Sequence, residues 1–227
     1  MSITGRDILK PLLKRVVPRF YRWYLRKERS HNYQGIEIKV PPGVFHPGLF
    51  FSTHLMLKHL EQLAMEERSV LEIGAGSGLV SIWCARKGAK VTATDISDVA
   101  LAAMAKNAEA NATELTIVKS DLFQELPAFR YDYVTINPPY YKGLPENEEQ
   151  FAWYAGPHYE YFHVLFADLK DYRHPESRVL MVVSEDCDLK LIKDIARLEH
   201  WSMEVVNTGR SWGEWLFVYE LRYLRAE

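Results

Sequence analysis

Cysteine is scarce in this sequence, and long apolar runs are missing. Cys84 and Cys187 are the two cysteines among 227 residues, and no C-x-x-C spacing joins them. This argues against a disulfide framework or a zinc site and fits a reducing compartment. No stretch approaches the ~18 apolar residues of a membrane-spanning helix, and no signal peptide is recognisable. We therefore expect a cytoplasmic protein without a transmembrane segment.

Histidine spacings typical of metal sites are also missing. The eight histidines are scattered, and His54/His59 and His158/His163 are five positions apart. Residues on one helix face are three or four positions apart, so these pairs do not share a face. We predict no metal site.

Charge is unevenly distributed along the chain. The net charge is −2, yet residues 1–40 hold ten basic and three acidic side chains, a local balance of +7. From Asp7 to about Lys27, apolar residues recur at near-helical spacing beside a row of arginines. We predict a basic helical arm over 1–35 and a second domain over 36–227. The arm either meets an acidic partner, such as RNA or the ribosome, or packs on its own domain.

A glycine turn between a strand and a helix organises the second domain. Val70, Leu71 and Ile73 form a short apolar run suited to a buried parallel strand, and glycines follow at Gly74, Gly76 and Gly78. Leu79–Lys87 is expected to be a helix, whose first N–H groups are free to bind an anion. A dinucleotide fingerprint needs glycine where Leu79 stands, which disfavours a nicotinamide oxidoreductase.

Acidic residues end the next two predicted strands. Lys90–Asp95 closes on Asp95, 19 residues beyond Gly76, a position at which a carboxylate accepts hydrogen bonds from ribose hydroxyls. A helix cap is the alternative role for this acid. The third strand, Leu115–Lys119, leads into Asp121.

Asn137-Pro138-Pro139-Tyr140 follows the fourth predicted strand, Tyr131–Asn137. A planar –NH₂ nitrogen is a poor nucleophile because its lone pair is delocalised, and two acceptors that hold both hydrogens orient that lone pair. The side-chain oxygen of Asn137 and the carbonyl of Pro138 suit this task, since proline has no N–H and restricts the backbone. Tyr140 would stack on the planar target. A rigid turn is the simpler explanation of the two prolines.

Two motifs together resemble a known enzyme family. Glu72–Gly78 reads E-x-G-x-G-x-G, similar to the first motif of class I S-adenosylmethionine (SAM) methyltransferases. The tetrad resembles the N-P-P-Y of the HemK-like, methyltransferase small-domain enzymes. The resemblance implies SAM as cofactor, the tetrad as catalytic residues, and Asp121 and Leu122 around the adenine. The implied cofactor-binding residues are Thr53, Glu72, Gly74, Ala75, Gly76, Gly78, Asp95, Ile96, Asp121, Leu122 and Asn137.

The implied reaction is methylation of a planar amide or exocyclic amine nitrogen. Tyr140 and the single compact domain favour a protein glutamine as acceptor, as in release-factor methyltransferases. The basic arm favours an RNA base, and the loop Pro41–Gly48 resembles that of ribosomal-RNA guanine methyltransferases. A SAM-binding module without catalysis is a further alternative, although its tetrad would be expected to be eroded.

The expected fold is α/β, with a Rossmann-like, seven-stranded, mostly parallel sheet, helices on both faces and a C-terminal antiparallel strand pair. The loop before helix Ser52–Met65 is expected to cover the cofactor, with Phe50 and Phe51 as possible lining and Thr53 as a possible N-cap. The aromatic segment Tyr141–Pro157 is the expected substrate lid.

Overall fold

The computed structural model describes residues 26–146, 148–211 and 213–224. Its strands are β1 (Arg29–Tyr33), β2 (Ile36–Val40), β3 (Ser69–Ile73), β4 (Lys90–Asp95), β5 (Thr116–Lys119), β6 (Tyr131–Ile136), β7 (Arg173–Ser184), β8 (Trp201–Ser211) and β9 (Glu214–Tyr223). Its helices are α2 (Phe51–Leu60), α3 (Leu79–Arg86), α4 (Asp98–Ala110), α5 (Glu160–Asp168) and α6 (Leu189–Leu198), with short 3-10 turns η1 (Glu148–Ala152) and η2 (Leu169–Tyr172).

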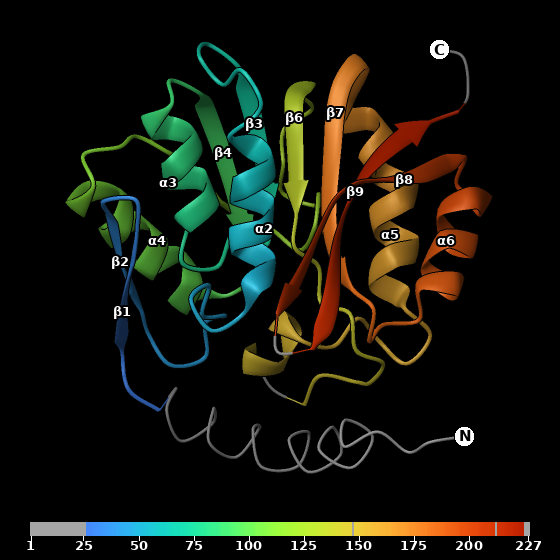
Figure 1. Ribbon diagram of the computed structural model, residues 1–227, viewed down its shortest axis with the longest axis horizontal. Coiled ribbons are helices and arrows are strands. Elements are labelled where there is room, and N and C mark those ends of the chain that lie inside the picture. Colours follow the sequence, from blue (N-terminus) through green and yellow to red (C-terminus); the bar gives the residue numbers. More distant parts are fainter. Residues whose placement is uncertain (1–25, 147, 212, 225–227) are drawn as a thin grey trace.

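Seven strands form one sheet in the order β5-β4-β3-β6-β7-β9-β8 (Figure 1). The strands from β5 to β7 run parallel, and β9 pairs antiparallel with both β7 and β8. The predicted sheet and its antiparallel end are confirmed.

Alternate residues of the central strands feed two cores, one on each face of the sheet. Val70 packs with α2 and α3, whereas its neighbour Leu71 packs with α5 and α6. Leu180 and Val179 divide between the two faces in the same way. This period of two explains why the buried strands read as continuous apolar runs. In Figure 1, α2 and α3 lie on one side of the sheet, and α5 and α6 lie on the other.

β1 and β2 form a separate antiparallel hairpin beside α4. Two asparagines, Asn107 within α4 and Asn111 at its C-cap, satisfy the backbone of β2. Asn107 Oδ1 accepts from Lys39 N–H at 2.8 Å, and its Nδ2 donates to the carbonyls of Lys39 and Ser77, both at 2.9 Å. Asn111 Nδ2 donates to Glu37 O at 2.7 Å. These bonds tie the hairpin to the turn between β3 and α3.

The hairpin corrects the predicted extent of the helical arm. Residues 29–33 were assigned to that arm, but they form strand β1 and pair with β2 from Arg29↔Val40 to Tyr33↔Ile36. Most of the predicted helix Asp7–Lys27 lies outside the described residues. Within the described part of the chain, no helix is long and apolar enough to cross a membrane.

Candidate active site

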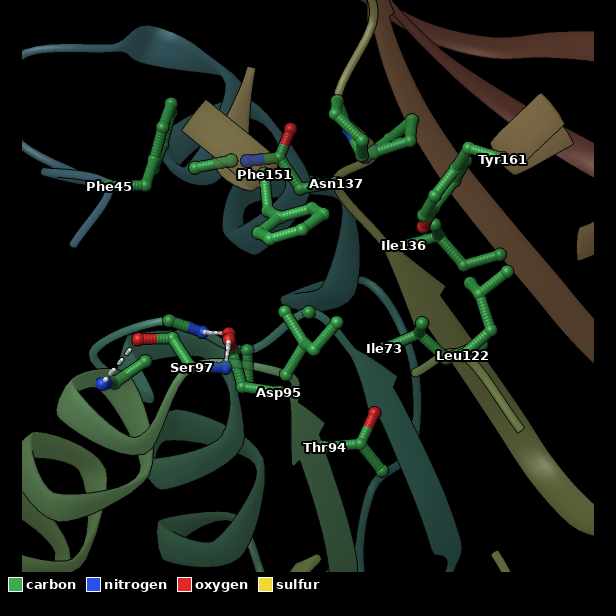
Figure 2. Close-up of a pocket in the computed structure, with 18 of the residues that line it drawn as sticks. Phe45, Ile73, Thr94, Asp95, Ser97, Leu122, Ile136, Asn137, Phe151 and Tyr161 are labelled. Carbon is green, nitrogen blue, oxygen red and sulfur yellow. Dashed lines mark hydrogen bonds between the residues drawn. The ribbon is translucent and has the colours of Figure 1, made fainter. Parts of the chain in front are cut away.

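A cavity of about 390 Å³ opens at the carboxyl ends of β3, β4 and β6, where the strand order reverses (Figure 2). Open α/β sheets bind ligands at this edge. Every predicted site residue except Gly78 lines the cavity. The lining includes Thr53, Glu72, Gly74, Ala75, Gly76, Asp95, Ile96, Asp121, Leu122, Asn137, Pro138, Pro139 and Tyr140.

Gly78 has a structural role instead of the predicted contact with the cavity. It is the N-cap of α3 at φ 82°, and a β-carbon there would lie 2.6 Å from Met104 Cγ. A side chain would therefore strain the backbone and collide with α4. Gly78 therefore allows α3 to begin in close contact with Met104 of α4, and this contact supports the glycine turn that precedes α3.

Asp95 joins the end of β4 to the glycine turn. Its Oδ2 accepts a hydrogen bond from Gly76 N–H at 2.8 Å, and its Oδ1 accepts one from Ser97 N–H at 3.0 Å (Figure 2). Burial raises the pKa of this carboxyl, and the backbone hydrogen bonds act in the opposite direction. Each oxygen retains capacity to accept a further donor. Ser97, rather than Asp95, caps α4, by accepting from Ala100 N–H.

Glu72 lies buried between β3 and α3, with 7% of its surface exposed. Ser81 of α3 donates a hydrogen bond to its Oε2. Burial raises the pKa of Glu72 to about 7, the hydrogen bonds with Ser81 lower it, and the charge of Asp95 adds to the rise. The carboxyl therefore titrates near neutrality, and a cationic ligand in the cavity would favour its ionised form.

Asp121 and Leu122 follow β5 at the cavity wall. Asp121 is exposed, whereas Leu122 is buried and has φ 53°. A left-handed backbone is uncommon for leucine and costs energy, and such strain clusters at ligand sites. The strained turn places an apolar side chain beside an acid at one end of the cavity.

The tetrad runs from the end of β6 along the cavity. Asn137 Nδ2 donates a hydrogen bond to Ser52 Oγ on α2 at 3.2 Å. Tyr140 is 9% exposed, and burial is the main cause that raises the pKa of its hydroxyl. Its main-chain carbonyl accepts a hydrogen bond from the Tyr159 hydroxyl at 3.2 Å. Both ends of the tetrad are thus fixed by side chains from other elements.

Two loops meet over the cavity through aromatic rings. Phe45 stacks on Phe50 with ring centroids 4.7 Å apart, and Phe50 meets Trp153 edge-on at 4.9 Å. Tyr141 fixes the second loop, because its N–H donates to Trp153 O and its carbonyl accepts from Ala155 N–H, both at 2.9 Å. The described part of the predicted lid that carries Trp153 is therefore packed on the loop before α2.

The aromatic lining differs from the expectation. Phe45 and Phe151 line the cavity, whereas Phe50 packs behind Phe45 and Phe51 contacts His54 edge-on. Phe151 is 42% exposed and points toward the cavity beside Asn137 (Figure 2). The sequence could not separate these four rings, because they lie in a loop, at the start of α2 or in the short turn η1, where no periodicity assigns a face.

Thr53 lines the cavity but does not cap a helix. α2 begins at Phe51, and its N-cap, Phe50, makes no side-chain hydrogen bond. Thr53 therefore lies inside the first turn, so the N-cap prediction is wrong. The same turn carries Ser52, which sequence reasoning overlooked; the polar Ser-Thr pair at a helix start facing a sheet was the available signal.

The charge of the cavity is of one sign. Among the described residues that line it, four are acidic and none is a lysine or arginine; the acids are Glu72, Asp95, Asp121 and Glu160. Carboxylates around a low-dielectric cavity favour a cation. No group of three or more metal-ligating side chains is found in the described part of the chain.

Comparisons with known proteins bear on the family and the fold of the chain. The sequence profile of the methyltransferase small domain matches residues 35–154, more than half of the chain. The "Putative protein N5-glutamine methyltransferase" of Methanocaldococcus jannaschii is 37% identical over 118 residues, 52% of this chain and 56% of that protein. A ribosomal RNA small subunit methyltransferase C of Escherichia coli is 32% identical over 51% of this chain and 34% of its own length. The chain thus spans about half the length of the first relative and about a third of the length of the second.

A solved structure shares the fold. The 16S rRNA N2-G methyltransferase of T. thermophilus, in complex with AdoMet (another abbreviation for SAM) and guanosine, has a TM-score of 0.61 at 21% identity. The match covers 88% of this chain and 50% of that chain. With the profile match over residues 35–154, the conclusion is that this chain belongs to the methyltransferase small domain family.

Proposed function

We propose that the cavity binds SAM. Its ammonium and sulfonium groups are cationic, which suits a lining with four carboxylates. The turn Gly74–Gly76, with Glu72 and Thr53, would hold the methionyl part. Asp95 and Ile96 would hold the ribose, and Asp121 and Leu122 the adenine. A relative of the same fold was solved with this cofactor, which supports the proposal.

The proposed activity is transfer of the SAM methyl group to a planar –NH₂ nitrogen. Bound SAM supplies an electrophilic methyl group. Asn137 Oδ1 and the Pro138 carbonyl would accept the two amine hydrogens, and the tetrad would hold the nitrogen in line. The acceptor nitrogen would form a bond to the methyl carbon as the carbon–sulfur bond breaks. The electron pair of the carbon–sulfur bond stays on sulfur. The surplus proton on nitrogen passes to water.

The observation that carries this function is the shared cavity. Asn137, at the end of β6, lines the same space as the glycine turn after β3, and its amide nitrogen is already engaged by Ser52. The Asn137 oxygen therefore remains as an acceptor beside the place proposed for SAM. A glutamine amide of a protein is the preferred acceptor, and the relative named for N5-glutamine methylation supports it.

An RNA or DNA base is the second candidate acceptor. The ten basic residues within positions 1–40 and the relative named for ribosomal RNA favour it. If that segment binds RNA, affinity should fall steeply with added salt. In this proposal the basic segment meets an acidic partner. The methyltransferase domain begins with the β1–β2 hairpin. Two cysteines without a disulfide fit a cytoplasmic location.

Labelled SAM incubated with fractionated cell extract tests the proposal and separates the acceptors. Label in protein supports a glutamine amide, and label in RNA supports a base. Asn137→Ala should abolish incorporation while SAM affinity, measured by calorimetry, changes less than about threefold, because the amide orients the acceptor. An Asn137→Ala variant with wild-type incorporation, or a wild-type protein that binds SAM and labels nothing, would favour a non-catalytic SAM-binding module.

A further inference from the structure

Ser52 lies at a position from which it acts on the tetrad without touching the cavity. It is the second residue of α2 and only 2% exposed. It does not line the cavity, yet its Oγ is 3.2 Å from Asn137 Nδ2. The two residues are 85 positions apart in the sequence. The contact therefore depends on how α2 packs against β7, β8 and β9, which brings its first turn beside Asn137.

The direction of this hydrogen bond decides what Asn137 offers to a ligand. An asparagine side chain has one acceptor oxygen and one –NH₂ donor, on opposite sides of the amide carbon. Since the nitrogen donates to Ser52, the oxygen is the atom left for a ligand. A 180° flip would present an N–H group to an incoming –NH₂, and neither group could accept from the other.

We infer that Ser52 is a positioning residue, which holds the Asn137 amide so that its oxygen faces the acceptor amine. The inference rests on the proposed transfer to an –NH₂ nitrogen. Burial strengthens the effect, because an amide hydrogen that lost the serine hydroxyl would be left without a partner at a site where Ser52 is only 2% exposed.

The orientation of Asn137 can be measured without a substrate. In protein labelled with ¹⁵N-asparagine, the side-chain signals of Asn137 are assigned by their loss in Asn137→Ala. We expect slow exchange of these N–H protons in the wild type and exchange at least about tenfold faster in Ser52→Ala. Ser52→Thr, which keeps the hydroxyl, should show the slow exchange of the wild type. Equal exchange in wild type and Ser52→Ala would overturn the inference.

Transfer kinetics separate positioning from folding. At saturating labelled SAM, Ser52→Ala should reduce the rate of incorporation into the extract about 10- to 100-fold, since misplacement of reacting groups by about 1 Å has effects of this size. SAM affinity should change less than about threefold. An unchanged rate would contradict the positioning role, whereas equal losses of rate and SAM affinity would indicate a general structural effect and also overturn it.

Ser69→Ala is the matched control. Ser69 opens β3 at the opposite end of the sheet, where its hydroxyl donates to Asp132 Oδ2 at 2.8 Å and accepts from Asp132 N–H at 2.9 Å. Its loss should leave incorporation within about twofold of wild type and Asn137 exchange unchanged. If the wild type itself labels nothing, the proposed function fails, while the exchange measurement still reports on the contact between Ser52 and Asn137.

Discussion

Tyr159 and Tyr140 are joined by a buried hydrogen bond of 3.2 Å, from the hydroxyl of the first to the main-chain carbonyl of the second. Tyr159 also accepts from Asp188 N–H at 3.2 Å, so one hydroxyl links the tetrad to the start of α6. Tyr159 itself has φ 60°, which is strained for a bulky residue. The strained backbone at Tyr159 accompanies the hydrogen bond that fixes Tyr140, the last residue of the tetrad.

Tyr159→Phe should lower the free energy of unfolding by about 1–3 kcal/mol, because the Tyr140 carbonyl and the Asp188 N–H lose their buried partner. Urea unfolding measures this loss. Tyr33→Phe is the control, since the Tyr33 hydroxyl makes an exposed hydrogen bond to Glu61 at 3.1 Å, and its loss should have a smaller effect. A Tyr159→Phe variant as stable as Tyr33→Phe would show that the hydroxyl does not secure the loop.

Asp95→Asn should weaken SAM binding about 10- to 100-fold, because the amide cannot offer two acceptor oxygens to the ribose and also accept from Gly76 and Ser97. Calorimetry measures the affinity. Asp98→Asn, at an exposed carboxylate paired with Lys119, is the control and should bind as the wild type does. Unchanged SAM affinity in Asp95→Asn would refute the ribose role.

Glu72→Gln should change how stability depends on pH. The folded pKa of about 7 lies above the ordinary glutamate value of 4.5, so the folded state binds more protons between these values and stability falls as pH rises from about 4.5 to 7. A shift of this size corresponds to on the order of 3 kcal/mol. Thermal melts of Glu72→Gln should lack this decline and show a higher midpoint at pH 8 than the wild type.

Glu67→Gln, at an exposed carboxylate paired with Lys90, should leave that decline in place. The same titration makes a prediction for the proposed ligand: below pH 7 the protonated Glu72 attracts a cation less, so SAM affinity should fall with acidification in the wild type and less in Glu72→Gln. Identical pH profiles for the two proteins would contradict a contact between Glu72 and the cofactor.

His46→Gln should make the fold less sensitive to acid. Burial lowers the pKa of His46 from 6.5 to about 4, with a contribution from the charge of His31. The unfolded state therefore binds more protons between these values, and stability is lost as pH falls from about 6.5 towards 4. His31 and His54 lie within the same cluster, with their Nε2 atoms 3.0 Å apart, and burial lowers both pKa values.

Thermal melts from pH 7 to pH 4 measure this effect. The decline of the midpoint should be shallower in His46→Gln than in the wild type. His158→Gln, at an exposed ring, is the matched control. If His46→Gln follows the wild-type curve, the buried ring is not a source of acid sensitivity.

The sequence was sufficient to predict the sheet and most of the cavity lining because these depend on local signals. Buried parallel strands are apolar runs, and Asp95 and Asn137 stand at strand ends, which a parallel sheet gathers at one edge. Gly78 carries the same local signal as Gly76, yet it packs against Met104 of α4, because only the tertiary structure decides which glycine lines the cavity.

Contacts between distant segments were beyond sequence reasoning. Nothing near Ser52 or Asn137 encodes their contact, which follows from the packing of α2. The strand β1 of the hairpin escaped notice for a related reason, although the alternation in Ile36–Val40 does predict β2. Arg29–Tyr33 is polar and does not form part of the main sheet, and its partner is the similarly short β2. The asparagines of α4 that hold it are polar residues whose role depends on the neighbouring backbone.

The hairpin also fixes where the preceding chain is attached. Arg29 pairs with Val40, and the loop that follows Val40 supplies Gly43, Val44 and Phe45 to the cavity wall. Arg29, at the start of the hairpin, therefore lies beside the strand that leads into the cavity wall. If the chain before Arg29 binds a macromolecule, the number of residues between Arg29 and the bound molecule would limit which side chains or bases of that molecule can reach the cavity.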